Sequence, residues 1–591
     1  MLYKELAEFY EKLDSTTKRL EKTYYISKLL KKAQPEEVKI LVLLSQGKIF
    51  PVWDRAKTGV SEKIVIKAIS RASGASGPEI ESEWKKKGDL GDVSEFLLAK
   101  HKQVSLFPKQ LMVMDFYKNI RSLSLQEGKG SVDAKLALIS EMLVNSSPME
   151  AKYIVRTLVD NLRVGVGAGS VRDAIIWAFF SEKLGIRYNS TSNDIEFTGD
   201  RQGYNELVEK VQEAIDLTND YSKVADLLKS KGMEGLQSID LAAGKPVNPM
   251  LFQKVQNVSH AFEVVGRPAA FEVKYDGFRM QIHFANNKCR IFTRRLDDVT
   301  EQFPDVSGRI EKIDANSFII DAEAVGYDPK TRKYLPFQSI SQRIKRKYDI
   351  EEISEKFPVE LNVFDILLLN GKNLLKMPFI ERRKLIEKLI SNEPYKIVTA
   401  KQIITGDEII AQNFFDAALK LGQEGVMAKN LQGIYKPGSR VGFGVKIKSI
   451  MDPLDLVIVG AEYGEGKRSG SLTSFHLACH SNEEFLEIGR VSTGLKELEQ
   501  EGGTTYKEMT ALLKPYIKKI IGKYVEILPE LIIEVGYEEI QKSPSYSSGY
   551  ALRFPRFIRL RNEEKTVDGI STLEDVEEQY LMQRGRNNFK N

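Results

Sequence analysis

The change in hydrophobic periodicity along the chain is the feature that most constrains its fold. From residue 1 to about 240, apolar residues recur at three- and four-residue spacing, as in PEEVKILVLLSQ and MEAKYIVRTLVDNL, which predicts helices throughout. A glycine and proline cluster at 244–249 ends this pattern, and alternating strands mixed with helices follow to about 450. After MDPLD at 451–455, short strands are separated by polar turns. We therefore predict an all-α domain (1–240), an α+β domain (241–450) and an all-β domain (451–591) with a small barrel, and no internal repeat is evident.

The composition of the chain excludes several classes of protein. With 42% hydrophobic and 29% charged residues, the chain is typical of globular proteins rather than disordered ones. No apolar run approaches the roughly 18 residues of a spanning helix, and the charged amphipathic start is unlike a signal peptide, so we expect a cytoplasmic protein that does not bind membranes. Two cysteines exclude a disulfide framework and a four-Cys zinc site. Five histidines leave carboxylates and phosphates as the expected metal ligands, which favours Mg²⁺, and the net charge of +5 permits nucleic-acid binding without demanding it.

The stretch from Phe271 to Ile282 carries the strongest local signal. Its apolar residues alternate on both sides of Asp276-Gly277, a dipeptide typical of two-residue hairpin loops. In such a hairpin Lys274 would lie opposite Arg279, and two opposed cations destabilise a sheet, a conflict that is typical of functional sites. The guanidinium would also favour the neutral amine of Lys274, which is its nucleophilic form. The alternative, a surface hairpin with both side chains in solvent, stays open.

Lys274-Tyr275-Asp276-Gly277-Phe278-Arg279 resembles the Lys-x-Asp-Gly-x-Arg signature of the covalent nucleotidyltransferases, which include DNA ligases, RNA ligases and mRNA capping enzymes. From about residue 130 to the C-terminus, the chain resembles an ATP-dependent DNA ligase of the archaeal and eukaryotic replicative type. This resemblance implies a helical DNA-binding domain, an adenylation (nucleotidyltransferase) domain and an OB-fold domain, and it implies that Lys274 is the catalytic lysine that carries AMP.

Further charged and aromatic residues follow in the order of the family's motifs. Those that the resemblance implies for the nucleotide are Glu272, Arg279, Arg294 in FTRRLDDVT, Glu323 in FIIDAEAVG, Phe364 in LNVFDILLLNG, Arg440, and Lys446 with Lys448 in GVKIKS. Phe364 would stack on adenine, Lys446 and Lys448 would hold the α-phosphate, and Glu323 and Glu424 in GQEGVMAKN would hold the metal. Each has a plain alternative, which is a surface acid for Glu323, core packing for Phe364 and a solvated strand face for the lysines.

A glycine-rich segment at 161–175, NLRVGVGAGSVRDAI, is a candidate contact to DNA. Gly165, Gly167 and Gly169 precede Ser170, which we expect to cap the helix VRDAIIWAFF. Backbone N–H groups at such a helix start bind phosphate. The segment, with Arg163, resembles part of the DNA-binding domain of replicative ligases. A dinucleotide fingerprint is disfavoured because no strand precedes the glycines, whereas a plain interhelical turn stays open.

The C-terminal region resembles the ligase barrel through SPSYSSGYALRFPRF at 543–557. Relatives usually continue to an Arg-x-Asp-Lys motif that orients the pyrophosphate leaving group. Here the segment from Arg561 to Lys565 has one extra residue and Glu in place of Asp. A second departure is Gly444, where many relatives carry Trp.

Taken together, the resemblance implies an ATP-dependent DNA ligase that seals nicks in duplex DNA through a lysyl-AMP intermediate, in replication, repair and recombination. ATP and Mg²⁺, with Mn²⁺ as a substitute, are the expected cofactors. Nicked double-stranded DNA is the expected partner, a sliding clamp is a candidate one, and a monomer is expected. The alternatives are an RNA ligase or capping guanylyltransferase with the same core, and a catalytically inactive DNA clamp. An NAD-dependent ligase is disfavoured because its four-Cys zinc site cannot be built from two cysteines.

Overall fold

The computed structural model describes residues 1–54, 56–100, 110–199, 201–335, 337–345, 348–448, 451–464, 468, 470–481, 484–497 and 503–583, without the side chains of residues 338, 345 and 440. The chain divides into two compact units. The first comprises Met1–Leu251, Gly277–Ala400 and Gln432–Val441, and the second comprises Phe252–Asp276, Lys401–Leu431 and Gly442–Asn591. The chain therefore crosses between the units five times. The domain boundaries at 240 and 450 stay predictions.

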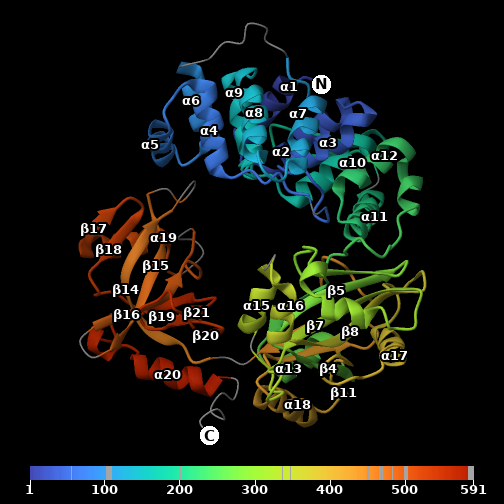
Figure 1. The fold of residues 1–591 in the computed structure, drawn as a ribbon, viewed down its shortest axis with the longest axis vertical. Coiled ribbons are helices and arrows are strands. Elements are labelled where there is room, and N and C mark those ends of the chain that lie inside the picture. The colour runs from blue at the N-terminus through green and yellow to red at the C-terminus, as the bar shows by residue number, and fades with distance from the viewer. Residues whose placement is uncertain are drawn as a thin grey trace. The chain divides into compact units, whose positions relative to one another are not determined.

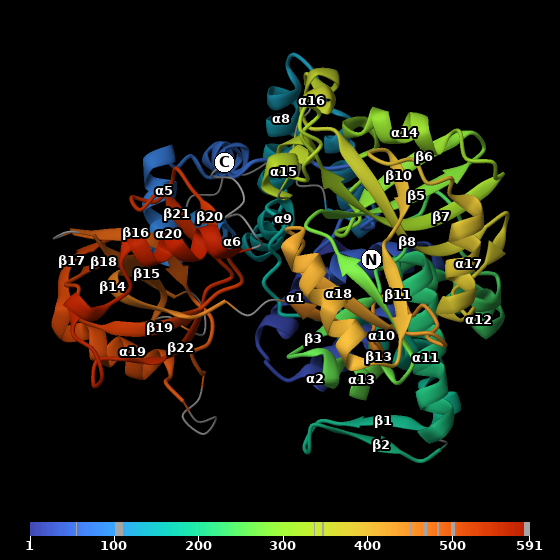
Figure 2. The same cartoon turned by 90° about the horizontal axis from the view of Figure 1, so that it is seen from below.

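Between Tyr3 and Gln237 the described residues are mainly helical, as the periodicity predicts (Figure 1). The helices are α1 Tyr3–Asp14, α2 Arg19–Lys32, α3 Pro35–Ser45, α4 Glu62–Ser73, α5 Gly77–Lys87, α6 Leu90–Lys100, α7 Val113–Ser122, α8 Ser131–Val144, α9 Pro148–Leu158, α10 Ala168–Leu184, α11 Arg201–Thr218 and α12 Tyr221–Gln237. Their apolar faces share one hydrophobic core. The periodicity did not predict the antiparallel pair of β1 (Ile186–Asn189) and β2 (Asp194–Phe197), which stands out from the helices in Figure 2.

Local sequence sets many helix ends. At the start of α9, the Ser147 hydroxyl accepts from the Glu150 N–H while the Glu150 carboxylate accepts from the Ser147 N–H, with Pro148 in the first helical position. Gly74 and Gly185 end α4 and α10 in the left-handed conformation that glycine adopts without a steric penalty.

A six-stranded sheet forms the rest of the first unit, in the order β10-β8-β7-β5-β6 with β9 beside β8. Its strands are β5 Phe278–Ala285, β6 Lys288–Thr293, β7 Ser317–Gly326, β8 Val359–Leu369, β9 Lys372–Asn373 and β10 Ile397–Thr399. The helices α14 Pro304–Ile310, α15 Phe337–Lys345, α16 Ile350–Lys356 and α17 Phe379–Leu389 accompany it. One face of the sheet is apolar and forms a core with residues of α14, α15 and α17.

The second unit contains a five-stranded sheet in the order β11-β4-β12-β13-β3. Its strands are β3 Leu251–Val255, β4 Ala269–Lys274, β11 Gln402–Thr405, β12 Gly425–Asn430 and β13 Arg440–Lys448, and α13 Val258–Val265 and α18 Glu408–Lys420 cover one face. Every neighbour of β4 comes from far along the chain, since β11 and β12 lie more than 120 residues after it.

The region after residue 451 is rich in strands, as predicted. They are β14 Leu454–Tyr463, β15 Leu472–Ser481, β16 Glu484–Val491, β17 Ile517–Ile521, β18 Tyr524–Ile527, β19 Ile532–Gly536, β20 Glu539–Lys542, β21 Tyr550–Arg553 and β22 Arg556–Leu560, with α19 Tyr506–Leu513 and α20 Leu573–Met582. A separate core lies among them. The OB-fold assignment stays a prediction. Within the described parts of the chain, we find no helix with the length and apolar character that a membrane crossing requires.

Candidate active site

The five-stranded sheet has an apolar face and a charged face, because alternate side chains of a strand point in opposite directions. Phe271, Val273 and Val426 belong to the core with α13 and α18. In β4 and β13 the charged residues alternate with apolar ones. The alternation that buries the apolar side chains therefore places Glu272, Lys274, Lys446 and Lys448 on the opposite face. The predicted nucleophile therefore lies at the end of β4 on the charged face.

Strand register aligns the lysines across three strands. Lys274 of β4 is paired with Gly425 of β12, and Gly425 is paired with Lys448 of β13. One row further, Met427 pairs with both Glu272 and Lys446. The fold thus brings Lys274 and Lys448, 174 positions apart, onto a common row.

Glu424 joins these two lysines. Its Oε2 forms ion pairs with Nζ of Lys274 and, at 3.0 Å, with Nζ of Lys448. Lys448 also pairs with Oε2 of Glu538 at 2.9 Å. Burial by itself would raise the pKa of Glu424, but the two ammonium groups outweigh burial and lower it to about 2. For Lys448, burial lowers the pKa and the two carboxylates more than reverse this, so it is raised. Glu424 is consequently ionised at any physiological pH.

Gly425 permits this close arrangement. Its φ is +145°, outside the region that residues with a Cβ readily adopt. A Cβ at this position would also lie 2.2 Å from the carbonyl oxygen of Ile447. The glycine therefore allows β12 to pass between the two lysine-bearing strands with Glu424 just before it.

Glu272 and Lys446 differ in their surroundings. Glu272 is almost fully buried, pairs with Nζ of Lys429 at 2.5 Å and accepts from the side-chain amide of Gln402 at 3.0 Å. Lys446 is half-buried on the row next to that of Lys448.

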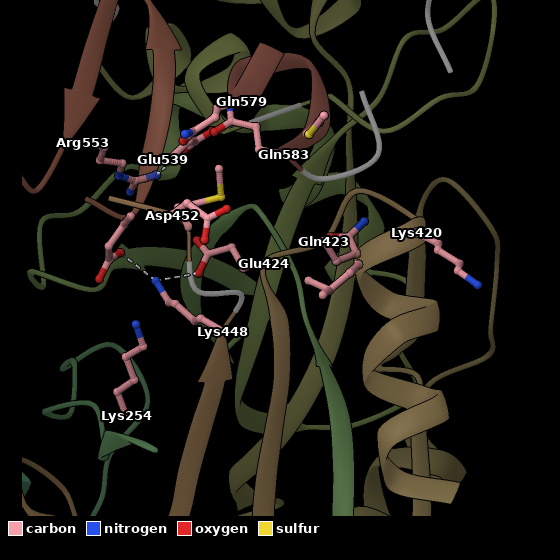
Figure 3. Close-up of a pocket in the computed structure, with 14 residues that line it drawn as sticks. Lys254, Lys420, Gln423, Glu424, Lys448, Asp452, Glu539, Arg553, Gln579 and Gln583 are labelled. Carbon is pink, nitrogen blue, oxygen red and sulfur yellow. Dashed lines mark hydrogen bonds and ion pairs between the residues drawn. The ribbon is translucent and has the colours of Figure 1, made fainter. Parts of the chain in front are cut away.

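A cavity of about 360 Å³ adjoins the Glu424 carboxylate (Figure 3). Glu424, Lys448 and Gln423 line it from the sheet, while Glu538, Arg553 and residues of α20 line it from the all-β region. Lys274 is not among the lining residues and reaches the cavity wall through its ion pair with Glu424. The lining mixes both charges, which suits a ligand that carries phosphate groups and hydrogen-bonding heteroatoms.

A second polar cluster lies in the first unit around Arg279 of β5. The guanidinium forms an ion pair with Asp321, donates to the hydroxyl of Tyr435 at 2.8 Å and lies 5.4 Å from the ring centroid of Phe364. Tyr435 donates to Asp321 at 2.9 Å. Burial acts to lower the pKa of Arg279, and the carboxylate of Asp321 outweighs burial and raises it. Arg279 and Glu323 are direct partners in the register of β5 and β7. The sheet thus brings Arg279, Glu323 and Phe364 together.

The predicted hairpin between β4 and β5 is wrong. β4 is flanked by β11 and β12, whereas β5 is flanked by β6 and β7 in the other sheet, so Lys274 and Arg279 are not cross-strand partners. Gly277 has no positive φ of the kind a tight hairpin turn needs. It is required instead because a Cβ would lie 2.3 Å from the carbonyl oxygen of Ala324.

Two predicted nucleotide contacts remain, Arg294 and Arg440. Arg294 is exposed in a turn after β6 in which the Leu296 N–H donates to the carbonyl of Thr293 at 2.9 Å. The side chain of Arg440 lies outside the described residues.

In the glycine-rich segment, the predicted cap is wrong. α10 begins at Ala168 with Gly167 as its N-cap, and Ser170 is buried inside the first turn. The helix starts earlier than expected because glycine itself is an acceptable N-cap residue. Arg163, at a φ of +58°, pairs with Asp89 at 3.1 Å. Gly165 and Gly167 are exposed, and Gly169 lies within the first turn.

The altered C-terminal motif is held by one carboxylate. Asp455 pairs with Nζ of Lys565 at 2.6 Å and with Nε of Arg561 at 3.3 Å. The other departure has a local counterpart, since the ring of Phe252 packs against Gly444 so closely that a Cβ there would lie 2.5 Å from it.

Sequence reasoning missed several residues of these clusters. Asp321 could have been found, because it lies two positions before Glu323 in FIIDAEAVG and so shares its strand face. Tyr435, Glu538 and Asp455 come from segments distant in sequence, and no local pattern signals them. Among the described residues, no cluster of three or more His, Cys, Asp or Glu side chains suits a metal ion.

The chain is similar to known proteins over nearly its whole length. The family models described as "DNA ligase N terminus", "ATP dependent DNA ligase domain" and "ATP dependent DNA ligase C terminal region" match residues 2–176, 249–448 and 468–564. The chain is 44% identical to the DNA ligase of Nanoarchaeum equitans over 589 residues, and 40% identical to that of Thermococcus fumicolans over 588, in each case covering 99% of both chains. The solved structure "Pmar-Lig_PreS3" is similar in fold, with a TM-score of 0.56 at 16% identity over 94% of this chain and 99% of the other.

Proposed function

The chain belongs to the ATP-dependent DNA ligase family, and from this premise we propose that Lys274 is the nucleophile that takes AMP from ATP. The protein is an enzyme that joins DNA with ATP. The observation that supports Lys274 is the row it shares with Gly425 and Lys448, because this row sets an amine, a buried carboxylate and a second cation around one point.

In the proposed first step, the neutral amine of Lys274 attacks the α-phosphorus of ATP in line. A nitrogen–phosphorus bond forms, the bond from the α-phosphorus to the oxygen bridging the β-phosphate breaks, and pyrophosphate leaves. The attacking nitrogen releases one proton to solvent and keeps the other, so the product is a phosphoramidate with one N–H. A 5′-phosphate oxygen of nicked DNA then attacks the bound phosphorus and frees the lysine, and the adjacent 3′-hydroxyl displaces AMP to join the strand.

Alignment and charge neutralisation carry most of the catalysis in phosphoryl transfer. We assign the α-phosphate to Lys446 and Lys448, whose ammonium groups project from neighbouring rows of β13. Glu424 would orient the Lys274 side chain through its ion pair. For Lys448, binding phosphate means exchanging its contacts with Glu424 and Glu538 for the more highly charged ligand.

Glu424 is also the residue that we propose for Mg²⁺. Both lysines approach its Oε2, and Oε1 has no ion-pair or hydrogen-bond partner among the described residues. A buried, ionised carboxylate with one available oxygen fits an ion that takes one or two protein carboxylates and completes its shell with phosphate and water. When bound, Mg²⁺ or Mn²⁺ would offset the negative charge of the triphosphate.

The remaining predicted residues are proposed to hold the rest of the nucleotide and the DNA. Phe364 would stack on adenine, Glu323 would hold the ribose or a metal, and the other proposed nucleotide contacts are Glu272, Arg279, Arg294 and Arg440. Residues 163–170 would bind DNA phosphates, with the backbone N–H groups of residues 165–169 as donors. We further propose that the protein acts as a cytoplasmic monomer in replication, repair and recombination, with a sliding clamp as a candidate partner.

Intact mass after incubation with ATP and Mg²⁺ tests the nucleophile. The wild-type protein should gain one AMP, and Lys274→Ala should gain none. Lys420→Ala, which changes an exposed lysine lining the same cavity, should behave as the wild type. An adenylate that persists in Lys274→Ala refutes the assignment. Labelling from GTP, or joining of RNA ends alone, would favour the capping enzyme or RNA ligase reading, and tight binding to nicked DNA without product would leave the inactive clamp.

A further inference from the structure

Lys22 of α2 is buried beneath the glycine-rich segment that precedes α10. Only 7% of the residue is exposed, and its Nζ donates to the carbonyl oxygen of Val164 at 2.5 Å and to that of Gly165 at 3.4 Å. Gly165 has a φ of +60°, and a Cβ there would lie 2.9 Å from the same Nζ. A side chain at position 165 would therefore crowd the Lys22 ammonium group, so the loop can approach the lysine this closely because residue 165 is glycine.

The lysine fixes which way the peptide groups of the loop face. In a planar trans peptide, the N–H points away from the C=O. Because Lys22 draws the carbonyls of Val164 and Gly165 into the fold, the N–H groups of Gly165 and Val166 point outward. Within the described chain, no N–H from residue 165 to residue 169 has a hydrogen-bond partner, and no side chain caps α10. Successive outward N–H groups at a helix start suit a phosphate.

The same construction occurs a second time, although the sequence shows no evident repeat. Lys135 of α8, 9% exposed, donates from Nζ to the carbonyls of Thr58 at 2.8 Å and Gly59 at 3.5 Å. Gly59 also has a φ of +60°, and Ser61, two residues later, is the N-cap of α4, just as Gly167 is the N-cap of α10. The N-cap dihedrals agree, at −93° and 158° for Ser61 and −88° and 158° for Gly167.

One difference separates the two loops. The first turn of α4 carries Glu62, whereas the first turn of α10 carries no acidic residue. A carboxylate in the first turn competes with an external anion for the N–H groups and repels it. The loop held by Lys135 is therefore an internal control, with the same buried lysine, glycine conformation and acceptors but an unfavourable charge for DNA.

We infer that Lys22 is a positioning residue for DNA binding, which holds the carbonyls of Val164 and Gly165 inward so that the N–H groups of residues 165–169 face the phosphates of the substrate. The inference rests on the proposed DNA-binding role of residues 163–170. Lys22 acts through the backbone and does not itself contact the DNA.

Anisotropy titration of the full-length variants with a nicked duplex tests this inference. Lys22→Met should raise the Kd about tenfold, the typical effect of losing one hydrogen bond to a charged group. Self-adenylation with ATP should stay within twofold of the wild type. The slope of log Kd against log salt should stay unchanged, because neutral N–H groups release no counterions, whereas a lysine in direct contact with phosphate contributes about one to it. Lys22→Arg, which retains cationic donors, should recover part of the affinity.

The matched variant is Lys135→Met. It removes the same two hydrogen bonds elsewhere in the helical region, so it should lower the thermal midpoint as Lys22→Met does while leaving the Kd within twofold of the wild type. Should Lys22→Met not fold by circular dichroism, Lys22→Gln, which keeps a shorter donor, replaces it.

Three results would overturn the inference: an unchanged Kd in Lys22→Met, an equal rise in Lys135→Met, or a salt slope reduced by about one. Failure of the wild type to form an adenylate or to seal a nick would instead refute the proposed function, so the two failures are distinguishable.

Discussion

Replacing Glu424 with Gln tests the electrostatic design of the site. Gln has the shape of the protonated acid, so the variant differs from the wild type mainly by the missing charge. Because the pKa of Glu424 is lowered from 4.5 to about 2, ionisation stabilises the folded form, at about 1.36 kcal/mol for each pKa unit. The expected loss for the variant at pH 7 is therefore about 3 kcal/mol.

The sign of this effect with pH follows from the lowered pKa. A carboxylate with a depressed pKa stabilises the fold fully above its unfolded value of 4.5, and this contribution is lost as the pH falls toward 2. The difference between wild type and Glu424→Gln should thus be unchanged from pH 7 to pH 5, fall to about 1.4 kcal/mol at pH 3 and vanish near pH 1.

The assay must report on the five-stranded sheet. All three tryptophans, Trp53, Trp84 and Trp177, lie in the helical region, so their fluorescence does not report on the stability of the five-stranded sheet. Hydrogen exchange of a peptide that covers β12 measures the opening free energy where the carboxylate acts. Glu538→Gln is the matched control, since it removes only one ion pair from Lys448 and should cost less. A difference below about 1 kcal/mol at pH 7, or one that does not shrink with acid, would refute the reasoning.

Three further substitutions have definite expected outcomes. Gly425→Ala should abolish self-adenylation and lower the opening free energy of β12, measured by hydrogen exchange, by about 1–3 kcal/mol, because of the positive φ and the nearby Ile447 carbonyl. Near-normal self-adenylation would contradict this. Asp321→Asn, which removes the charge of a fully buried carboxylate from its pair with the largely buried Arg279, should destabilise the first unit by about 3–5 kcal/mol in denaturant titration, and a shift below about 1 kcal/mol would show the pair to be dispensable. Phe364→Leu should raise the KM for ATP about tenfold without changing the unfolding midpoint, and an unchanged KM would exclude stacking on adenine.

The extent to which the sequence predicted this molecule depends on the range of the pattern used. Helices such as α3 and α9, and the strand before Lys274, follow from periodicities of 3.6 and 2 that each segment carries by itself. The pairing of β4 does not follow, because alternation is the same whether the partner is the next strand or one far along the chain. The hairpin predicted at Asp276-Gly277 was wrong for the same reason. In the sequence, a glycine needed for close packing against Ala324 cannot be distinguished from a glycine needed for a turn.

In the candidate site, too, individual residues could be predicted from the sequence, but the contacts between distant segments could not. Lys274 was predicted from its local pattern and from the family resemblance, whereas Glu424 and Lys448 were predicted from the resemblance alone. What no short motif contains is that both lysines share one oxygen of Glu424, or that Glu538 takes part. The dihedral match between the loops before α4 and α10 was also invisible, because only Gly-Val is common to them in sequence.

The repeated crossing of the chain between its two units has a consequence for biosynthesis. β4 emerges from the ribosome about 150 residues before β12, its central neighbour, a delay of roughly eight to thirty seconds at ordinary translation rates. During that interval Phe271 and Val273 have no sheet to join, while the helical region upstream can already be folded. The nascent enzyme thus carries a bare apolar strand for many seconds, which makes it a natural client for chaperones that shield such segments.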